Sequence, residues 1–236
     1  CEATLPDLTG AISYDDGSCA CTVTQSPVAG TTISADTLVT ITVTNSAGSD
    51  NCDVTVTVAD TAPPVINRLG STPVTVECGD PYFDDGATAL DNCDGDLTAS
   101  IIVNDPVTPG VVGNYTVTYN VSDSAANAAV EVTREVNVVD SVAPTLTLLG
   151  SDPVNLECGD SYTDAGATAA DNCDLNLDAA IVVGGDVVDT GTVGTYVITY
   201  NVSDSAANAA TQQTRTVNVA DTTPPVLTLN GSSPVT

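Results

Sequence analysis

The chain has 236 residues and a formal net charge of −28, because 31 acidic residues face only three basic ones, all of them arginines. So little positive charge cannot neutralise nucleic-acid phosphates or anionic lipid, and no apolar run is long enough to span a bilayer; we therefore exclude nucleic-acid binding and membrane insertion. The chain also lacks the histidine and lysine that supply most general bases, activated nucleophiles and Schiff bases, so we predict that it is not an enzyme.

The first 60 residues are the most divergent part of the chain. The segments LVTITVTNSAGSDN and CDVTVTVAD alternate apolar with polar residues, which predicts half-buried strands. Cys1 aligns with Cys78 of a later repeat. We therefore expect this first module to lack an opening strand equivalent to residues 65–76.

Two copies of a unit of about 80 residues follow, and the length of the shared motifs makes the repeat plain. STPVTVECGDPYFDDGATALDNCDGDLTASI from Ser71 returns as SDPVNLECGDSYTDAGATAADNCDLNLDAAI from Ser151, and GNYTVTYNVSDSAANAA from Gly113 returns as GTYVITYNVSDSAANAA from Gly194. Alternating Val/Thr runs separated by turn residues predict short strands, and no segment has a helical period. In the first copy these runs are 74–78, 101–104, 114–121 and 130–139.

Short strands at this spacing predict an all-β fold of tandem immunoglobulin-like β-sandwiches in a linear array. Proline-rich junctions follow each predicted last strand and act as semi-rigid linkers. The predicted modules are 1–60, 61–140 and 141–221, and residues 222–236 are the first strand of a following module.

Two motif sets carry a resemblance to known families. Residues 65–221 resemble the bacterial immunoglobulin-like repeats of large secreted and cell-surface proteins, in ECGD-x-Y-x-D-x-GATA-x-DNCD, G-x-Y-x-x-x-Y-x-VSDSAANAA and R-x-VNV-x-D. A relative of these repeats occurs in the accessory domains of an insecticidal crystal toxin. Residues 1–60 resemble a hyalin-repeat module in C-x-ATLPDLTG, TVTQSPVAG-T and NC-x-VTVTVAD. The resemblance implies a structural or adhesive role.

Eight cysteines, an even number, favour disulfides and an oxidising compartment outside the cytoplasm. In each long repeat two cysteines lie 15 residues apart at equivalent places, which predicts the bonds Cys78–Cys93 and Cys158–Cys173. Each would contribute about 3 kcal/mol by restricting the unfolded chain. In the first module two pairings remain open: Cys1–Cys19 with Cys21–Cys52, or Cys1–Cys21 with Cys19–Cys52.

Aspartates outnumber glutamates 26 to 5, and many lie in loops beside Asn and Gly, where short carboxylates can converge on a calcium ion. One candidate group lies in the loops after the ECGD motifs: Asp80, Asp84, Asp85, Asp91, Asp94, Asp96, Asp160, Asp164, Asp171, Asp174 and Asp178. A second group lies at the module ends and in the SDSAAN turns: Asp60, Asp140, Asp221, Asp123 and Asp204. The spacing is not that of an EF-hand, and the alternative is a solvated acidic face with Asx turns. Calcium is the predicted cofactor.

The leading hypothesis is a structural extracellular protein, bacterial by its resemblance: the repeat segment of a cell-surface filament, stalk or giant adhesin. The tail 226–236 would complete the first module of the next copy head-to-tail, or further repeats of one longer chain would follow it. The alternative is a ligand-binding accessory module of a larger secreted enzyme or toxin. Sugar binding would need exposed aromatic residues, but we expect the strand tyrosines in the core: Tyr115, Tyr119, Tyr196 and Tyr200.

Overall fold

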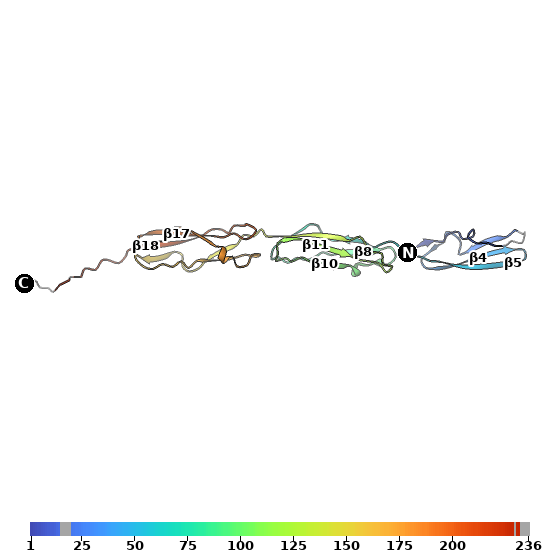
Figure 1. The fold of residues 1–236 in the computed structure, drawn as a ribbon, viewed down its shortest axis with the longest axis horizontal. Helices are drawn as coiled ribbons and strands as arrows, with labels where there is room; N and C mark the ends of the chain where they lie inside the picture. Colours follow the sequence, from blue (N-terminus) through green and yellow to red (C-terminus); the bar gives the residue numbers. More distant parts are fainter. Residues whose placement is uncertain (15–19, 229, 232–236) are drawn as a thin grey trace, which may run out of the picture. The chain divides into compact units, whose positions relative to one another are not determined.

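The computed structural model describes residues 1–14, 20–228 and 230–231, and its regular structure consists of strands and two short 3-10 helices (Figure 1). The chain divides into two compact units. The first unit comprises Cys1–Val74, Phe83–Pro106 and Thr116–Glu135, and the second comprises Thr75–Tyr82, Val107–Tyr115 and Val136–Thr236. The predicted all-β immunoglobulin-like fold is confirmed.

The N-terminal part of the first unit contains two small antiparallel sheets. One pairs β1 (Ala3–Thr4) with β3 (Thr32–Ile33), and the other has the order β2 (Thr22–Ser26), β4 (Thr37–Asn45), β5 (Gly48–Val56). Leu5, Ile33 and Val39 form its buried core. The tight β4–β5 turn is held by the Asn45 side-chain carbonyl, which accepts the N–H groups of Ala47 and Gly48 at 2.9 and 3.2 Å, a pattern typical of turn asparagines.

The second repeat builds a three-stranded and a four-stranded sheet. The first has the order β6 (Val65–Arg68), β8 (Ala87–Asp91), β9 (Gly95–Asp96); the second has the order β10 (Ile102–Asn104), β11 (Gly113–Asn120), β12 (Val132–Val139), β7 (Val74–Glu77). The 3-10 helix η1 (Thr98–Ser100) follows β9. The four alternating runs found in the sequence correspond to β7, β10, β11 and β12, so this prediction is confirmed to within two residues.

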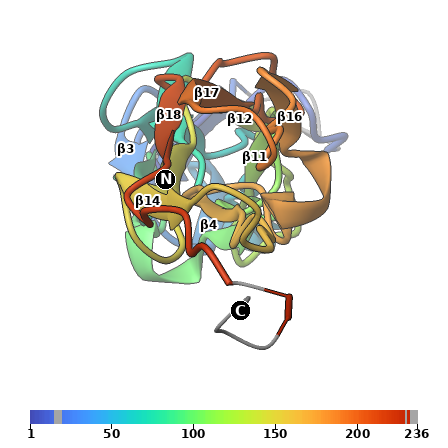
Figure 2. The ribbon, with the colours of Figure 1, turned by 90° about the vertical axis from the view of Figure 1, so that its left-hand side faces the viewer.

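The third repeat has the same plan within the second unit. One sheet pairs β13 (Thr145–Leu148) with β15 (Ala167–Ala170), and the other has the order β14 (Val154–Glu157), β18 (Gln213–Ala220), β17 (Gly194–Asn201), β16 (Val182–Gly185). The 3-10 helix η2 (Leu177–Ala180) lies between β15 and β16. Strand β14 runs parallel to β18, and Figure 2 shows it beside that strand. Alternate residues of β17 and β18 face the core, where Ile198, Tyr200 and Val217 are buried.

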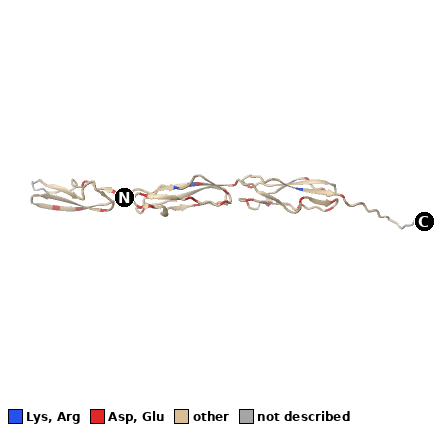
Figure 3. Ribbon diagram, turned by 180° about the vertical axis from the view of Figure 1, so that it is seen from behind, with Lys and Arg blue, Asp and Glu red and all other residues tan. Residues whose placement is uncertain are grey.

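An arginine is buried in each long repeat, although the sequence carries few basic residues anywhere (blue in Figure 3). Arg134 and Arg215 are 0% and 1% exposed, and each lies over a buried tyrosine ring, with 6.0 Å from the guanidinium carbon to the centroid of Tyr119 and 5.6 Å to that of Tyr200. The burial of Tyr119 and Tyr200 confirms their predicted place in the core, whereas Tyr115 and Tyr196 are only partly buried.

The buried arginines are ion-paired with Asp84 and Asp164, and their guanidinium groups also donate to the carbonyls of Leu69 and Leu149, respectively. Burial alone would raise the pKa of the Asp164 carboxyl, but the hydroxyls of Tyr200 and Tyr162 and the charge of Arg215 hold that pKa below its usual value. Asp84 and Asp164 were expected to be calcium ligands. The structure corrects this expectation: they are the counter-ions of buried arginines.

Candidate functional site

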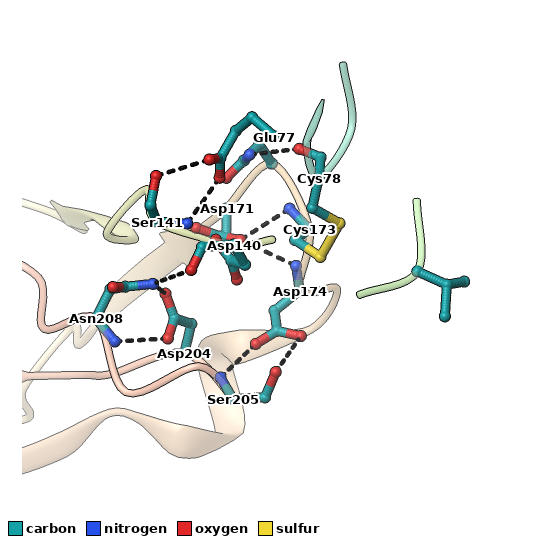
Figure 4. Close-up of a disulfide and its surroundings, with 12 residues drawn as sticks. Glu77, Cys78, Asp140, Ser141, Asp171, Cys173, Asp174, Asp204, Ser205 and Asn208 are labelled. Carbon is teal, nitrogen blue, oxygen red and sulfur yellow. Dashed lines mark hydrogen bonds between the residues drawn. A yellow bond between two sulfur atoms is a disulfide. The ribbon is translucent and has the colours of Figure 1, made fainter. Parts of the chain in front are cut away.

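Three aspartates of the second unit converge at one point. Asp140 follows β12, Asp171 follows β15, and Asp204 lies in the turn after β17. One carboxylate oxygen from each lies within 4.8 Å of the others, and Figure 4 shows the three side chains together beside a disulfide. We call this set the Asp140 trio.

Two turns orient the carboxylates that reach toward Asp140. One Asp171 oxygen accepts the backbone N–H groups of Cys173 and Asp174 at 2.8 and 3.0 Å, which leaves its other oxygen buried and without a hydrogen-bond partner. Both Asp204 oxygens accept from Asn208, from the backbone N–H at 2.7 Å and from the side-chain amide at 2.9 Å. The same amide also donates to the Asp140 carbonyl at 3.2 Å, so it ties the two segments together.

The Asp140 carboxylate has the most unfavourable environment of the three. Both of its oxygens are buried and neither accepts a hydrogen bond of normal geometry. Burial raises the pKa of this carboxyl, and the negative charges of Asp171 and Asp204 raise it further; the backbone N–H of Val142 lowers the pKa, but by less than burial and the neighbouring charges raise it. A buried carboxylate without well-placed donors is costly, and a cation between the three groups would remove both the desolvation cost and the repulsion.

The first unit contains an equivalent set, the Asp60 trio, formed by Asp60, Asp91 and Asp123. Hydrogen bonds from the backbone of Asp94 and Cys93 lower the pKa of Asp91, and its second oxygen is buried without a partner, as is one oxygen of Asp60. Each trio therefore takes one residue from the end of one repeat and two from turns of the next.

Each trio lies beside a disulfide, and the pairing differs from the prediction. The structure forms Cys1–Cys93 and Cys78–Cys173, with sequence separations of 92 and 95. The predicted bonds Cys78–Cys93 and Cys158–Cys173 are therefore wrong, and so are both pairings proposed for Cys1, with Cys19 or with Cys21.

The two cysteines of one repeat have different surroundings, which explains the error. The Cys78 N–H donates to the Val139 carbonyl at 2.7 Å, next to Asp140, whereas Cys93 belongs to the turn of Asp91 and binds Cys1. Cys52 and Cys158 form no disulfide with the described residues, which overturns the predicted bond Cys21–Cys52. The alternative bond Cys19–Cys52 involves Cys19, which lies outside the residues that the structure describes.

Most other predicted ligands accept hydrogen bonds from segments of their own repeat. Asp94 and Asp174 accept the backbone N–H and the hydroxyl of Ser124 and Ser205, and so dock the two SDSAAN turns. Asp96, Asp160 and Asp178 accept backbone N–H groups of Thr98, Glu157 and Ala169. The structure does not bring these residues into a trio, nor does it bring Asp80, Asp85 or Asp221 into one. The converging sets thus combine one member of the predicted loop group with two of the module-end group.

No helix in the described part of the chain has the length and hydrophobicity needed to cross a bilayer. The fold and the sites define a protein made of immunoglobulin-like repeats, in which disulfides link successive repeats. The family model for the Ig-like domain of bacterial surface proteins matches residues 66–138 and 146–219, more than half of the chain. The chain belongs to this family of bacterial surface Ig-like domains, and the resemblance inferred from the motifs is confirmed.

Similar proteins include hyalin, a pesticidal crystal protein and a bacterial lipoprotein. Hyalin of Strongylocentrotus purpuratus is 35% identical over 194 residues, which are 75% of this chain and 15% of hyalin. The pesticidal crystal protein Cry22Aa of Bacillus thuringiensis is 35% identical over 128 residues, which are 52% of this chain and 17% of that protein. The lipoprotein BT2262 of Bacteroides thetaiotaomicron is 30% identical with a TM-score of 0.31, over 35% of this chain and 40% of that one. The chain thus spans less than half the length of each.

Proposed function

We propose that this chain is a structural segment of a secreted bacterial surface protein, a filament, stalk or adhesin, whose successive repeats are joined by calcium and disulfides. The observation that supports it most directly is Asp140, whose two oxygens are buried without a hydrogen bond of normal geometry beside two further carboxylates. Family membership supports a role at the surface. Further repeats or copies of the chain, joined head to tail, are the partners that we propose.

The donor set favours calcium over other metals. The three side chains of the Asp140 trio offer only carboxylate oxygens, which suit a hard cation, whereas zinc sites in proteins are built mainly from sulfur and nitrogen ligands. Calcium accepts six to eight oxygens in a flexible geometry, so water and backbone carbonyls can complete a shell begun by three carboxylates. Extracellular calcium modules bind with dissociation constants of about 10⁻⁴–10⁻³ M, and we expect values in this range.

The proposed cation would bind residues of two successive repeats and so hold them together. Asp140 belongs to the end of the second repeat, and Asp171 and Asp204 belong to turns of the third. A cation held by all three restrains the linker against both turns, and the Cys78–Cys173 bond restrains the same segments covalently. The Asp60 trio and Cys1–Cys93 repeat this arrangement one repeat earlier.

Calcium titration of the full chain tests the proposal. At a calcium concentration 100 times the dissociation constant, each site should add about 2.7 kcal/mol to the free energy of unfolding. Calorimetry should find two sites in the wild type and one in Asp140→Asn. The matched control is Asp80→Asn, an exposed aspartate outside both trios, which should keep both sites. Unchanged melting with calcium and with chelator would refute the proposal, as would equal loss in the two variants.

A further inference from the structure

We call each aspartate trio, together with its neighbouring disulfide, a junction between repeats. The second unit also contains the residues that would form one side of a third junction, around Cys158. At the end of β14, the Cys158 N–H donates to the Ala220 carbonyl at 2.8 Å, just as Cys78 at the end of β7 donates to Val139 at 2.7 Å. The preceding glutamate also acts in the same way in both places: Glu77 accepts the N–H and hydroxyl of Ser141, and Glu157 those of Thr222.

The two places differ in what lies opposite the cysteine. Cys78 is fully buried in its bond to Cys173, whereas Cys158 is partly exposed and in no disulfide with the described residues. Asp221, the counterpart of Asp140, is exposed. Leu227 is 93% exposed, whereas its counterpart Leu146 is 7% exposed and part of the core of the third repeat.

We infer that Cys158 is a disulfide site for a further Ig-like module, and that its partner is the cysteine of that module's Asp-Asn-Cys-Asp turn. The inference rests on the proposed role of the junctions and identifies the partner by its turn. Both complete junctions of this chain use this pairing, because Cys93 and Cys173 each occupy such a turn. Cys1 and Cys78, which are equivalent to Cys158 in the repeat, are both disulfide-bonded, and this is the evidence that Cys158 is also a disulfide-forming cysteine.

The Asp-Asn-Cys-Asp turn also supplies a hydrogen-bond donor and a carboxylate to the junction. In the complete junction, the side-chain amide of Asn172 donates to the Cys78 carbonyl at 2.6 Å, while Asp171 joins Asp140. An incoming turn would therefore bring a donor for the Cys158 carbonyl and a carboxylate for Asp221. Bond formation removes two protons and two electrons from the two thiols, and a small disulfide such as oxidised glutathione accepts them and becomes two thiols.

The test extends the full chain after Thr236 with a second copy of residues 156–221. This position completes a repeat, because 226–236 align with 145–155. The extended chain is oxidised with glutathione, and its disulfides are mapped by mass spectrometry without reduction. We expect Cys158 bonded to the added turn cysteine. A monomer on a non-reducing gel places the module in the same polypeptide, and a ladder of oligomers places it in another copy.

Two results would overturn the inference: a bond between the added module's own two cysteines, or a Cys158 that remains open to alkylation after oxidation. In the control, Cys158→Ser in the extended chain should leave the added turn cysteine alkylatable and the bonds Cys1–Cys93 and Cys78–Cys173 intact. Calcium binding by the unextended chain reports on the proposed function separately. If two calcium ions bind but Cys158 does not pair, only the inference about Cys158 fails.

Discussion

Replacement of Arg215, the buried arginine of the third repeat, should be among the most damaging single substitutions in the chain. Arg215→Met keeps an apolar side chain in the core but leaves Asp164 without its cation and the Leu149 carbonyl without the guanidinium donor. Loss of one member of a buried ion pair typically costs 3–5 kcal/mol. We expect the free energy of unfolding to fall by about 4 kcal/mol.

Guanidinium denaturation followed by circular dichroism, at neutral pH and with calcium in excess, measures this loss. Arg68→Met is the control, because the partly exposed Arg68 guanidinium donates to the Thr133 carbonyl and should contribute only about 1 kcal/mol. Addition of Asp164→Asn to Arg215→Met should recover part of the loss, since it removes the uncompensated charge. A double variant no more stable than Arg215→Met would refute the reasoning, as would equal losses in Arg215→Met and Arg68→Met.

Two further predictions concern the Asp140 trio and its disulfide. Because burial and the charges of Asp171 and Asp204 raise the pKa of Asp140, the folded chain holds a proton on this carboxyl more tightly than the unfolded chain does. The contribution of Asp140 to stability without calcium should therefore rise as the pH falls towards that raised pKa. Saturating calcium should abolish this slope, and equal slopes with and without calcium would contradict the assignment. Replacement of Cys78 and Cys173 by serine opens a 95-residue link and should cost about 4 kcal/mol in denaturant unfolding; a loss below 1 kcal/mol would contradict it.

The strands were predictable because one physical pattern specifies them. Each Val/Thr run must present alternate residues to the core, and β11 and β17 bury Val117, Tyr119, Ile198 and Tyr200 as the alternation predicts. For the two aspartate trios, the sequence predicted that acidic residues would cluster but not which of them would meet. Composition and loop position indicated acidic convergence, but which of the candidate aspartates meet depends on how linker and turns approach one another, and this is not encoded in local sequence.

The disulfide pairing could not be predicted for a related reason. The repeat shows which cysteines are equivalent, but it does not show whether a cysteine bonds within its own repeat or in the next. Proximity in sequence is weak evidence, because the entropy of loop closure grows only with the logarithm of length. The buried arginines did leave a signal: two of only three cations, Arg134 and Arg215, stand at equivalent positions, two positions before the same VNV motif.

The disulfide and the carboxylates act on the same segments and should reinforce each other. Cys173 is bonded to Cys78, and its N–H donates to Asp171, so the bond holds the Asp171 turn close to the segment that carries Asp140. Segments held together in this way meet at a high effective concentration, which reduces the entropy that a cation must overcome to gather its ligands. The coupling is reciprocal, because a bound cation that holds the two segments together also keeps the two thiols in position to form their bond. Such a junction would be strongest in a compartment that is both oxidising and rich in calcium.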